Sequence, residues 1–245
     1  ARHFFDLDAI GAGLVVATAR TELERAASTG AMVVTAPPGT GKTTFVPPLI
    51  AHLVAERAGE RPADAPLPRV LLTQPRRVAV RAAARRISQL DRSALGGPVG
   101  FTVRGERKVG RDTQLEVLTP GVLLRRLISD PSLDDVGAVI LDEIHERSVD
   151  GDLLLGLIAE VRALRDDLIV VAMSATLDAA HVAELLGAAS GTGPAQIVEV
   201  PSALFPLATE YSPFVGARLD ERGVTRGFLA HLAAVALASQ RAAGT

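Results

Sequence analysis

Residues 36–44 read APPGTGKTT, the most specific local pattern in this chain. It continues a run of apolar residues, Ala31–Ala36, and it opens a segment of helical composition, Thr43–Arg57. It departs from the pattern G-x-x-x-x-G-K-[ST] only at Ala36, where one small residue replaces another. A strand, a glycine-rich turn and a helix in this order predict a phosphate-binding loop.

Each residue type in this loop has a chemical reason to be there. Gly39 and Gly41 let the backbone curl so that successive N–H groups point inward, and the helix that follows adds the positive end of its dipole. Lys42 brings a compact charge to the β- and γ-phosphates, and the Thr43 hydroxyl suits Mg²⁺. Only Lys42 and Lys108 are lysines among the 26 basic residues. We expect ATP to be bound by Pro38, Gly39, Thr40, Gly41, Lys42, Thr43 and Thr44.

The alternation of apolar runs and helical segments after residue 31 predicts a doubly wound α/β fold with helices on both faces of a mostly parallel sheet. Most runs lack the period-two alternation of half-buried strands, which is typical of parallel strands covered on both faces. The predicted strands are Ala31–Ala36, Val70–Thr73, Leu115–Thr119, Val136–Leu141, Leu168–Met173 and Ile197–Val200. The predicted helices are Thr43–Arg57, Arg76–Leu90, Gly121–Ile128, Gly151–Leu164 and Ala179–Leu186.

The ends of the chain break this rhythm. Residues 1–30 are expected to form a helical lead-in to an ATP-binding domain at residues 31–200. Residues 201–245 contain three prolines before a last predicted helix, Thr225–Arg241. A helix with an apolar stripe normally packs against a partner. We therefore expect residues 201–245 to be a linker and the first helix of a second, truncated domain.

Composition excludes several classes of protein. The formal net charge is −2, so any nucleic-acid partner must be met by a local patch. Aromatic residues make up 3% of the chain, too few for a surface of stacked aromatics. The chain has no cysteine, which excludes disulfides, cysteine zinc sites and thiol nucleophiles. No apolar run is long enough to span a bilayer. We expect a soluble cytoplasmic protein without a membrane partner.

A second acidic element lies about a hundred residues after the loop. The run Val139–Leu141 ends in Asp142 and Glu143, and a buried parallel strand delivers such side chains to the edge where the phosphate loop lies. Asp142 is expected to hold Mg²⁺, and Glu143 to orient and deprotonate the attacking water. The alternative for Asp142 is a helix N-cap.

Polar residues near this element suggest a coupling role. His145 lies two residues beyond Glu143, and we expect it to act beside the γ-phosphate because no other histidine lies at a metal-ligand spacing from it. Ser174 and Thr176 follow the next strand, so their hydroxyls would emerge at the same edge and could bond His145. The alternative for this Ser-x-Thr pair is a helix cap.

An arginine-rich segment predicts where nucleic acid binds. Residues 65–90 contain six arginines and no acidic residue. Arg76 and Arg77 come where strand turns to helix, and we expect them to contact backbone phosphates. For Arg81 and Arg85 a solvated helix face is the alternative. A second basic group is diluted by acidic neighbours and could line the same channel: Arg104, Arg107, Lys108 and Arg111.

Taken together, the motifs resemble the DEAH/RHA group of superfamily 2 helicases, most of all the bacterial HrpB-type branch. The matching residues are APPGTGKTT (36–44), TQPRR (73–77), TPG (119–121), DEIHER (142–147) and SAT (174–176). The resemblance implies an ATP-driven enzyme of two RecA-like domains that moves along single-stranded RNA or DNA. It also implies nucleic-acid contacts by Gln74, Pro75, Thr119, Pro120 and Gly121, an adenine contact by Arg86, and a relay through Ser174 and Thr176.

Two departures accompany the resemblance. Ile144 stands where the family has alanine, and no sequence resembles QRxGRxGR, the arginine-rich motif of the second domain. Without that motif we expect nucleotide binding with little hydrolysis by this piece, because a missing arginine finger lowers the rate by about 10³- to 10⁵-fold. A P-loop kinase or NTPase for a small metabolite, and a non-catalytic nucleic-acid-binding module, remain the alternatives.

Overall fold

The computed structural model describes residues 3–60, 67–175, 179–188, 191, 193–200 and 209–242. The chain forms two compact units, Ala1–Ala203 and Leu204–Thr245, and each is described by itself.

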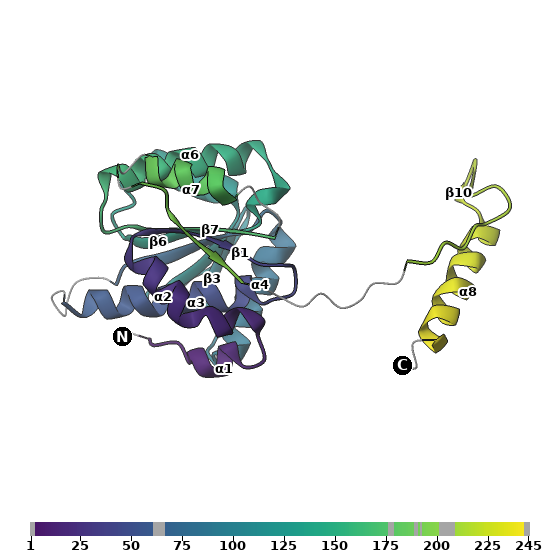
Figure 1. Ribbon diagram of the computed structural model, residues 1–245, viewed down its shortest axis with the longest axis horizontal. Coiled ribbons are helices and arrows are strands. Elements are labelled where there is room, and N and C mark those ends of the chain that lie inside the picture. The colour runs from purple at the N-terminus through teal and green to yellow at the C-terminus, as the bar shows by residue number, and fades with distance from the viewer. Residues whose placement is uncertain are drawn as a thin grey trace. The chain divides into compact units, whose positions relative to one another are not determined.

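The first unit is built on an eight-stranded sheet with the strand order β4-β3-β5-β2-β6-β7-β1-β8 (Figure 1). Neighbouring strands are parallel, except that β4 pairs antiparallel with β3 at the edge. The strands are β1 (Ala31–Thr35), β2 (Arg69–Thr73), β3 (Val99–Val103), β4 (Glu106–Lys108), β5 (Leu115–Leu118), β6 (Val136–Leu141), β7 (Ile169–Ser174) and β8 (Gln196–Glu199). The doubly wound α/β fold is confirmed.

Helices cover both faces of this sheet, as Figure 1 shows. One face packs against α1 (Leu7–Gly11), α2 (Arg20–Ser28), α3 (Lys42–Arg57) and α4 (Arg77–Leu90). The other packs against α5 (Pro120–Ser129), α6 (Val149–Leu164) and α7 (Ala179–Ala188). Central strands are buried along their whole length, which explains their continuous apolar runs: β6 and β7 have no exposed residue.

The structure contains every predicted strand and helix of the first unit, with ends shifted by a few residues at most. It adds the β3–β4 hairpin: β4 is exposed and charged, and the buried β3 lacks a continuous apolar run because Gly100 and Thr102 interrupt it. It also places α1, a 3₁₀ helix at Val15–Ala19 and α2 on the same apolar core as the sheet, through Phe5, Ile10, Val16 and Leu23.

The parallel arrangement brings the polar motifs to one edge. The carboxyl ends of β1, β2, β5, β6 and β7 are followed by residues 36–41, Gln74, Thr119, Asp142 and Ala175. Strand β3 runs parallel to β5, so its last residue, Val103, delivers Arg104 to the same edge. The site is therefore assembled from residues far apart in the sequence.

The second unit contains a short hairpin, β9 (Leu219–Asp220) and β10 (Gly223–Val224), followed by α8 (Arg226–Ala242). Phe214 packs against Phe228 and His231 of α8, each with a centroid separation of 5.4 Å, and the Arg218 guanidinium lies over the Phe228 ring. The predicted helix Thr225–Arg241 is present with its start shifted by one residue.

Candidate nucleotide and nucleic-acid site

The phosphate loop between β1 and α3 has the backbone that its glycines predict. Gly39 and Gly41 have φ angles of +82° and +92°, a region that other residues rarely adopt. At Gly41 a side chain would also collide, because its Cβ would lie 2.9 Å from a methyl carbon of Leu14. This position therefore favours glycine for its φ, and a side chain there would also force Leu14 to shift.

The N-terminal segment supports the loop from behind, which sequence reasoning missed. The Val16 N–H donates to the Thr40 carbonyl at 3.1 Å, and Leu14 fills the space at Gly41. Thr40 is buried, and its hydroxyl donates to the Pro37 carbonyl. The only signal in the sequence was the apolar character of residues 14–16, which does not say what they pack against.

Lys42 is the first residue of α3 and is buried. Its ammonium donates to the Ala36 carbonyl at 2.5 Å and the Pro37 carbonyl at 3.2 Å, so the side chain folds back over the loop. Burial lowers the pKa of Lys42, and the charges of Asp142 and Glu143 oppose that shift. A cation with few partners and little water gains strongly from an anionic phosphate.

Asp142, at the end of β6, is the centre of a buried hydrogen-bond network. Its Oδ2 accepts from the Thr43 hydroxyl and from Gln74 Nε2, both at 2.5 Å, and its Oδ1 accepts from the Glu143 N–H at 2.8 Å. Burial raises the pKa of Asp142 to about 6, Glu143 adds to the shift, and the bond from Thr43 opposes it. The network joins the phosphate loop to β2 and β6.

These residues fit Mg²⁺. Thr43 and Asp142 place a hydroxyl and a carboxylate oxygen 2.5 Å apart at the mouth of the loop, and both are hard oxygen donors. Within the described part of the chain no group of three or more His, Asp or Glu side chains could hold a metal. Mg²⁺ with a nucleotide typically uses one or two carboxylates, with phosphates and water for the rest.

Glu143 follows Asp142 and directly precedes a short 3₁₀ helix, Ile144–Glu146, which contains His145. Glu143 has a φ of +55°, a strained backbone for a residue with a side chain. His145 Nδ1 lies 3.2 Å from Ser174 Oγ and accepts from the Ala175 N–H at 3.4 Å. The ring hydrogen therefore belongs on Nε2, which lies 3.4 Å from Glu143 Oε2.

The contact expected between Ser174 and His145 is thus present, and Ser174 is fully buried at the end of β7. This contact connects β7, the strand next to β6, to His145, whose Nε2 faces Glu143 Oε2. Thr176, for which the same coupling was predicted, lies outside the described residues.

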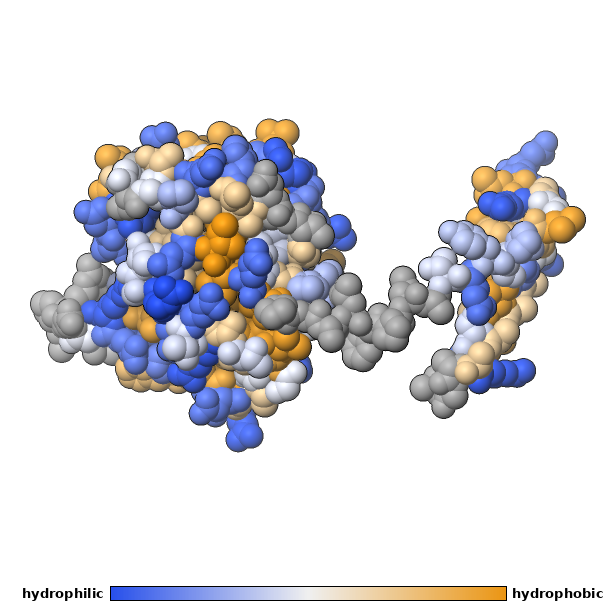
Figure 2. Space-filling model, in the orientation of Figure 1, coloured by the Kyte–Doolittle hydropathy of each residue, from blue (hydrophilic) through white to orange (hydrophobic). Residues whose placement is uncertain are grey.

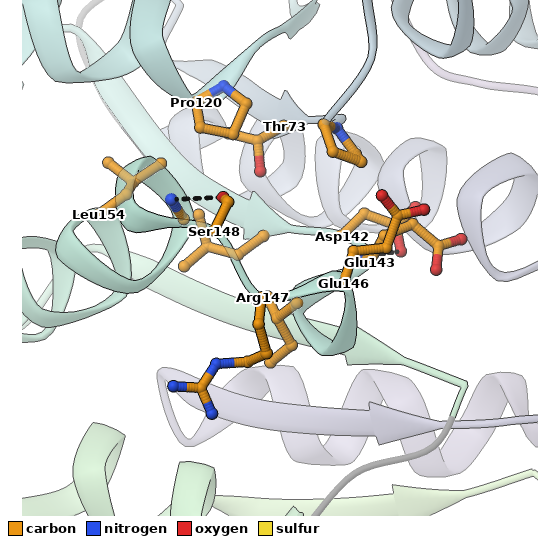
Figure 3. Close-up of a pocket in the computed structure, with 12 residues that line it drawn as sticks. Thr73, Pro120, Asp142, Glu143, Glu146, Arg147, Ser148 and Leu154 are labelled. Carbon is orange, nitrogen blue, oxygen red and sulfur yellow. Dashed lines mark hydrogen bonds between the residues drawn. The ribbon is translucent and has the colours of Figure 1, made fainter.

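A small cavity of about 70 Å³ is lined by Asp142, Glu143 and residues of the segment that follows them. Figure 3 shows the side chains that line it. Asp142, Glu143 and Glu146 gather at one end, while Pro120, Ser148 and Leu154 line the opposite end (Figure 3). Ile144, which replaces the family's alanine, also lines it and is partly buried. The cavity shares Pro75, Pro120 and Ser148 with a larger groove.

That larger groove, the arginine groove, has a volume of about 480 Å³ and is lined by three exposed arginines, Arg77, Arg104 and Arg125. Its other walls come from Pro75, Thr119, Pro120, Gly121, Val122, Ser148, Val149 and Asp150. The structure thus brings Pro75, Arg77 and residues 119–121 together, as the motifs predicted. It adds Arg125 of α5, which no motif in the sequence singled out.

Gln74 and Arg76 do not line the arginine groove. Gln74 is 4% exposed and its amide donates to Asp142, so its side chain lies at the nucleotide edge. The exposed guanidinium of Arg76, which directly precedes Arg77 of the groove, donates to Glu146 Oε1 at 3.1 Å. The predicted contacts of both residues with nucleic acid stay predictions.

Arg81, Arg85 and Arg86 of the arginine-rich segment also lie on α4. Arg81 forms an ion pair with Glu106 of the hairpin, so it is less available to nucleic acid than an unpaired arginine on a helix face. Arg86 is exposed and lies about 14 Å along α4 from Arg77, from about 1.5 Å per residue. No contact of Arg86 bears on the adenine prediction. Arg107 and Lys108 lie on β4, and neither these two nor Arg111 lines the arginine groove.

Comparison with known proteins agrees with this geometry. The model of the DEAD/DEAH box helicase family matches residues 19–185. The chain belongs to the DEAD/DEAH box helicase family. The match begins in the N-terminal helices and ends in α7, so it includes the phosphate loop, the Asp142–Glu143 turn and the arginine groove. Membership does not favour a metabolite kinase or a non-catalytic binding module.

The chain is similar to named RNA helicases. It is 40% identical over 184 residues, or 74% of the chain, to the ATP-dependent RNA helicase HrpB of Escherichia coli (strain K12). It is 38% identical over 177 residues, or 72% of the chain, to the DExH-box ATP-dependent RNA helicase DExH1 of Arabidopsis thaliana. These matches agree with the DEAH group and its HrpB-type branch.

The matches cover 21% and 17% of these two relatives, so the chain spans about a fifth of the length of the curated relatives it matches. Among the described residues, no helix is both long and apolar enough to cross a membrane.

Proposed function

We propose that this chain is the ATP-binding motor domain of an ATP-dependent RNA helicase, which binds Mg-ATP and single-stranded RNA and couples ATP hydrolysis to movement along the strand. One observation carries the proposal. The small cavity at the Asp142–Glu143 turn, where Asp142 accepts a hydrogen bond from Thr43 of the phosphate loop, shares Pro75, Pro120 and Ser148 with the arginine groove. The acidic turn and the basic groove are therefore adjacent.

On the nucleotide side, the loop N–H groups and Lys42 bind the phosphates, as at other helix N-termini. Thr43 and Asp142 would hold Mg²⁺, which neutralises charge on the phosphate oxygens. Glu143 accepts the proton of the attacking water, and His145, held by Ser174 and Ala175, positions the Glu143 carboxylate through Nε2. Because Asp142 already takes hydrogen bonds from Thr43 and Gln74, its carboxylate is held in place before the nucleotide arrives.

On the nucleic-acid side, Arg77, Arg104 and Arg125 bind backbone phosphates, aided by the N-terminus of α5 at Thr119–Gly121. Backbone contacts suit a strand that must pass regardless of sequence, and the low aromatic content agrees with that. RNA is proposed over DNA because the relatives are named RNA helicases. The absence of cysteine supports a cytoplasmic location.

The greater length of the relatives supports a second RecA-like domain as the partner of this one. Such a partner would supply the arginine fingers that we find no match for here, and so most of the hydrolysis rate. The chain alone is expected to bind nucleotide and RNA and to hydrolyse ATP slowly.

Binding of a fluorescent, non-hydrolysable Mg-ATP analogue and of a labelled single-stranded RNA tests the proposal. Lys42→Ala should abolish nucleotide binding, and Lys108→Ala, which removes the other lysine, should not. Glu143→Gln should bind nucleotide and lose the residual ATP hydrolysis. The proposal fails if Lys42→Ala binds nucleotide normally, or if a small metabolite but not RNA stimulates hydrolysis.

A further inference from the structure

A carboxylate already occupies one predicted phosphate contact. Arg76 directly precedes Arg77 of the arginine groove, and its guanidinium donates to Glu146, three residues after Glu143. The pair joins two segments 70 residues apart in sequence. A carboxylate and a phosphate offer the same kind of acceptor to a guanidinium, so nucleic acid must compete with Glu146 for Arg76.

A phosphate can displace Glu146 from Arg76 at a low free-energy cost. The side chains of Arg76 and Glu146 are 74% and 36% exposed, so water screens their attraction. Exposed ion pairs of this kind contribute about 0 to 1 kcal/mol. A strand that enters the arginine groove arrives beside Arg76 and meets little resistance from Glu146.

The segment that would be released carries backbone strain. Glu143 and Arg147 have φ angles of +55° and +41°, and Glu146 lies between them. Such conformations persist only where surrounding contacts hold them. Ile144 packs against the apolar core, and polar contacts from outside the segment come from Ser174 and Ala175 on His145, from Asp152 on Arg147, and from Arg76 on Glu146. Of the two exposed arginine–carboxylate pairs among these contacts, Arg76–Glu146 is the one whose arginine directly precedes an arginine of the groove, Arg77.

We propose that Glu146 is a positioning residue that couples RNA to the ATP site: it holds Arg76 without RNA, and RNA phosphate takes Arg76 and frees the Glu143–Arg147 segment. The inference rests on the proposed function, since it requires RNA in the arginine groove. It assigns to Glu146 a role as an internal competitor of RNA.

The test compares RNA affinity and backbone exchange in matched variants of the chain. Glu146→Gln removes the competitor with little change of shape. Asp152→Asn is the control, because it removes one negative charge from another exposed ion pair, with Arg147, in the same region. Both are combined with Arg76→Ala. The probes are a fluorescein-labelled single-stranded oligouridylate at low salt and amide hydrogen exchange of residues 143–147.

Glu146→Gln should raise RNA affinity by up to about fivefold over Asp152→Asn, the factor that corresponds to about 1 kcal/mol. In the Arg76→Ala background the two should be indistinguishable. RNA should speed amide exchange of residues 143–147 in the wild type, and in Glu146→Gln exchange should be fast before RNA is added.

An equal gain in affinity for Glu146→Gln and Asp152→Asn would overturn the inference, because it would mean a general charge effect. So would a gain that persists without Arg76, or exchange that RNA leaves unchanged in the wild type. If no variant and no wild-type chain binds RNA, the proposed function fails together with the inference. If all bind RNA equally, only the inference fails.

Discussion

Gln74 Nε2 donates a buried hydrogen bond of 2.5 Å to Asp142 Oδ2, the same oxygen that accepts from the Thr43 hydroxyl. Gln74 directly follows β2 and precedes Pro75, which lines the arginine groove. One carboxylate oxygen therefore ties the phosphate loop to the strand that leads to the groove. A displacement of β2 by RNA would therefore change the hydrogen bond to Asp142.

Removal of this donor should weaken the nucleotide site. Gln74→Met keeps the volume and removes the amide, so the buried Asp142 carboxylate loses a partner, at a cost of about 1 to 3 kcal/mol. We expect the free energy of unfolding to fall by that amount in chemical denaturation. Gln89→Met changes an exposed glutamine of α4 and should have little effect. Equal stability of the two variants would show that Gln74 does not support Asp142.

The ionised carboxylate of Asp142 should lower the stability of the fold, so stability should depend on pH. Its pKa is raised to about 6 by burial, so the folded chain binds this proton more tightly than the unfolded chain. The carboxyl group therefore stabilises the fold fully below its unfolded pKa, about 3.9. That stability is lost as the pH rises through about 6.

Asp142→Asn should accordingly stabilise the chain at neutral pH, by at most about 3 kcal/mol. The gain should shrink steadily as the pH falls from about 6 toward about 4. Denaturation of both proteins from mildly acidic to neutral pH measures it. A gain that does not depend on pH would assign it to packing and not to the buried charge. Mg-nucleotide binding by this variant should be weak at every pH.

The arginine groove should determine how RNA binding depends on salt. Each of Arg104→Ala and Arg125→Ala removes one phosphate contact, so the slope of log affinity against log salt should fall by about 0.7 for single-stranded RNA. Arg107→Ala removes the same charge from β4, outside the groove lining, and should leave the slope nearly unchanged. If all three variants behave alike, the groove is not the RNA site.

Most of the fold and the core of the site could be predicted because their signals are local. Buried parallel strands leave continuous apolar runs, and the loop at residues 36–44 carries its own chemistry in consecutive residues. The β3–β4 hairpin was not predicted because β4 is exposed and charged and because Gly100 and Thr102 interrupt the apolar residues of β3. The sequence also shows neither the burial of Gln74 nor the ion pair of Arg76. Their partners, Asp142 and Glu146, are 68 and 70 residues away.

The support that Leu14 gives to the phosphate loop can be isolated with two glycine variants. Gly39→Ala and Gly41→Ala both force alanine into a positive φ, at a cost of about 1 to 2 kcal/mol. At Gly39 the new methyl group meets nothing within 4 Å, whereas at Gly41 it meets Leu14 at 2.9 Å. We expect Gly41→Ala to lower stability and Mg-nucleotide affinity more than Gly39→Ala does. The double variant Leu14→Ala/Gly41→Ala should recover affinity toward that of Gly39→Ala, because the collision is removed and only the backbone strain remains. Without that recovery, the Leu14 side chain would have no part in shaping the loop.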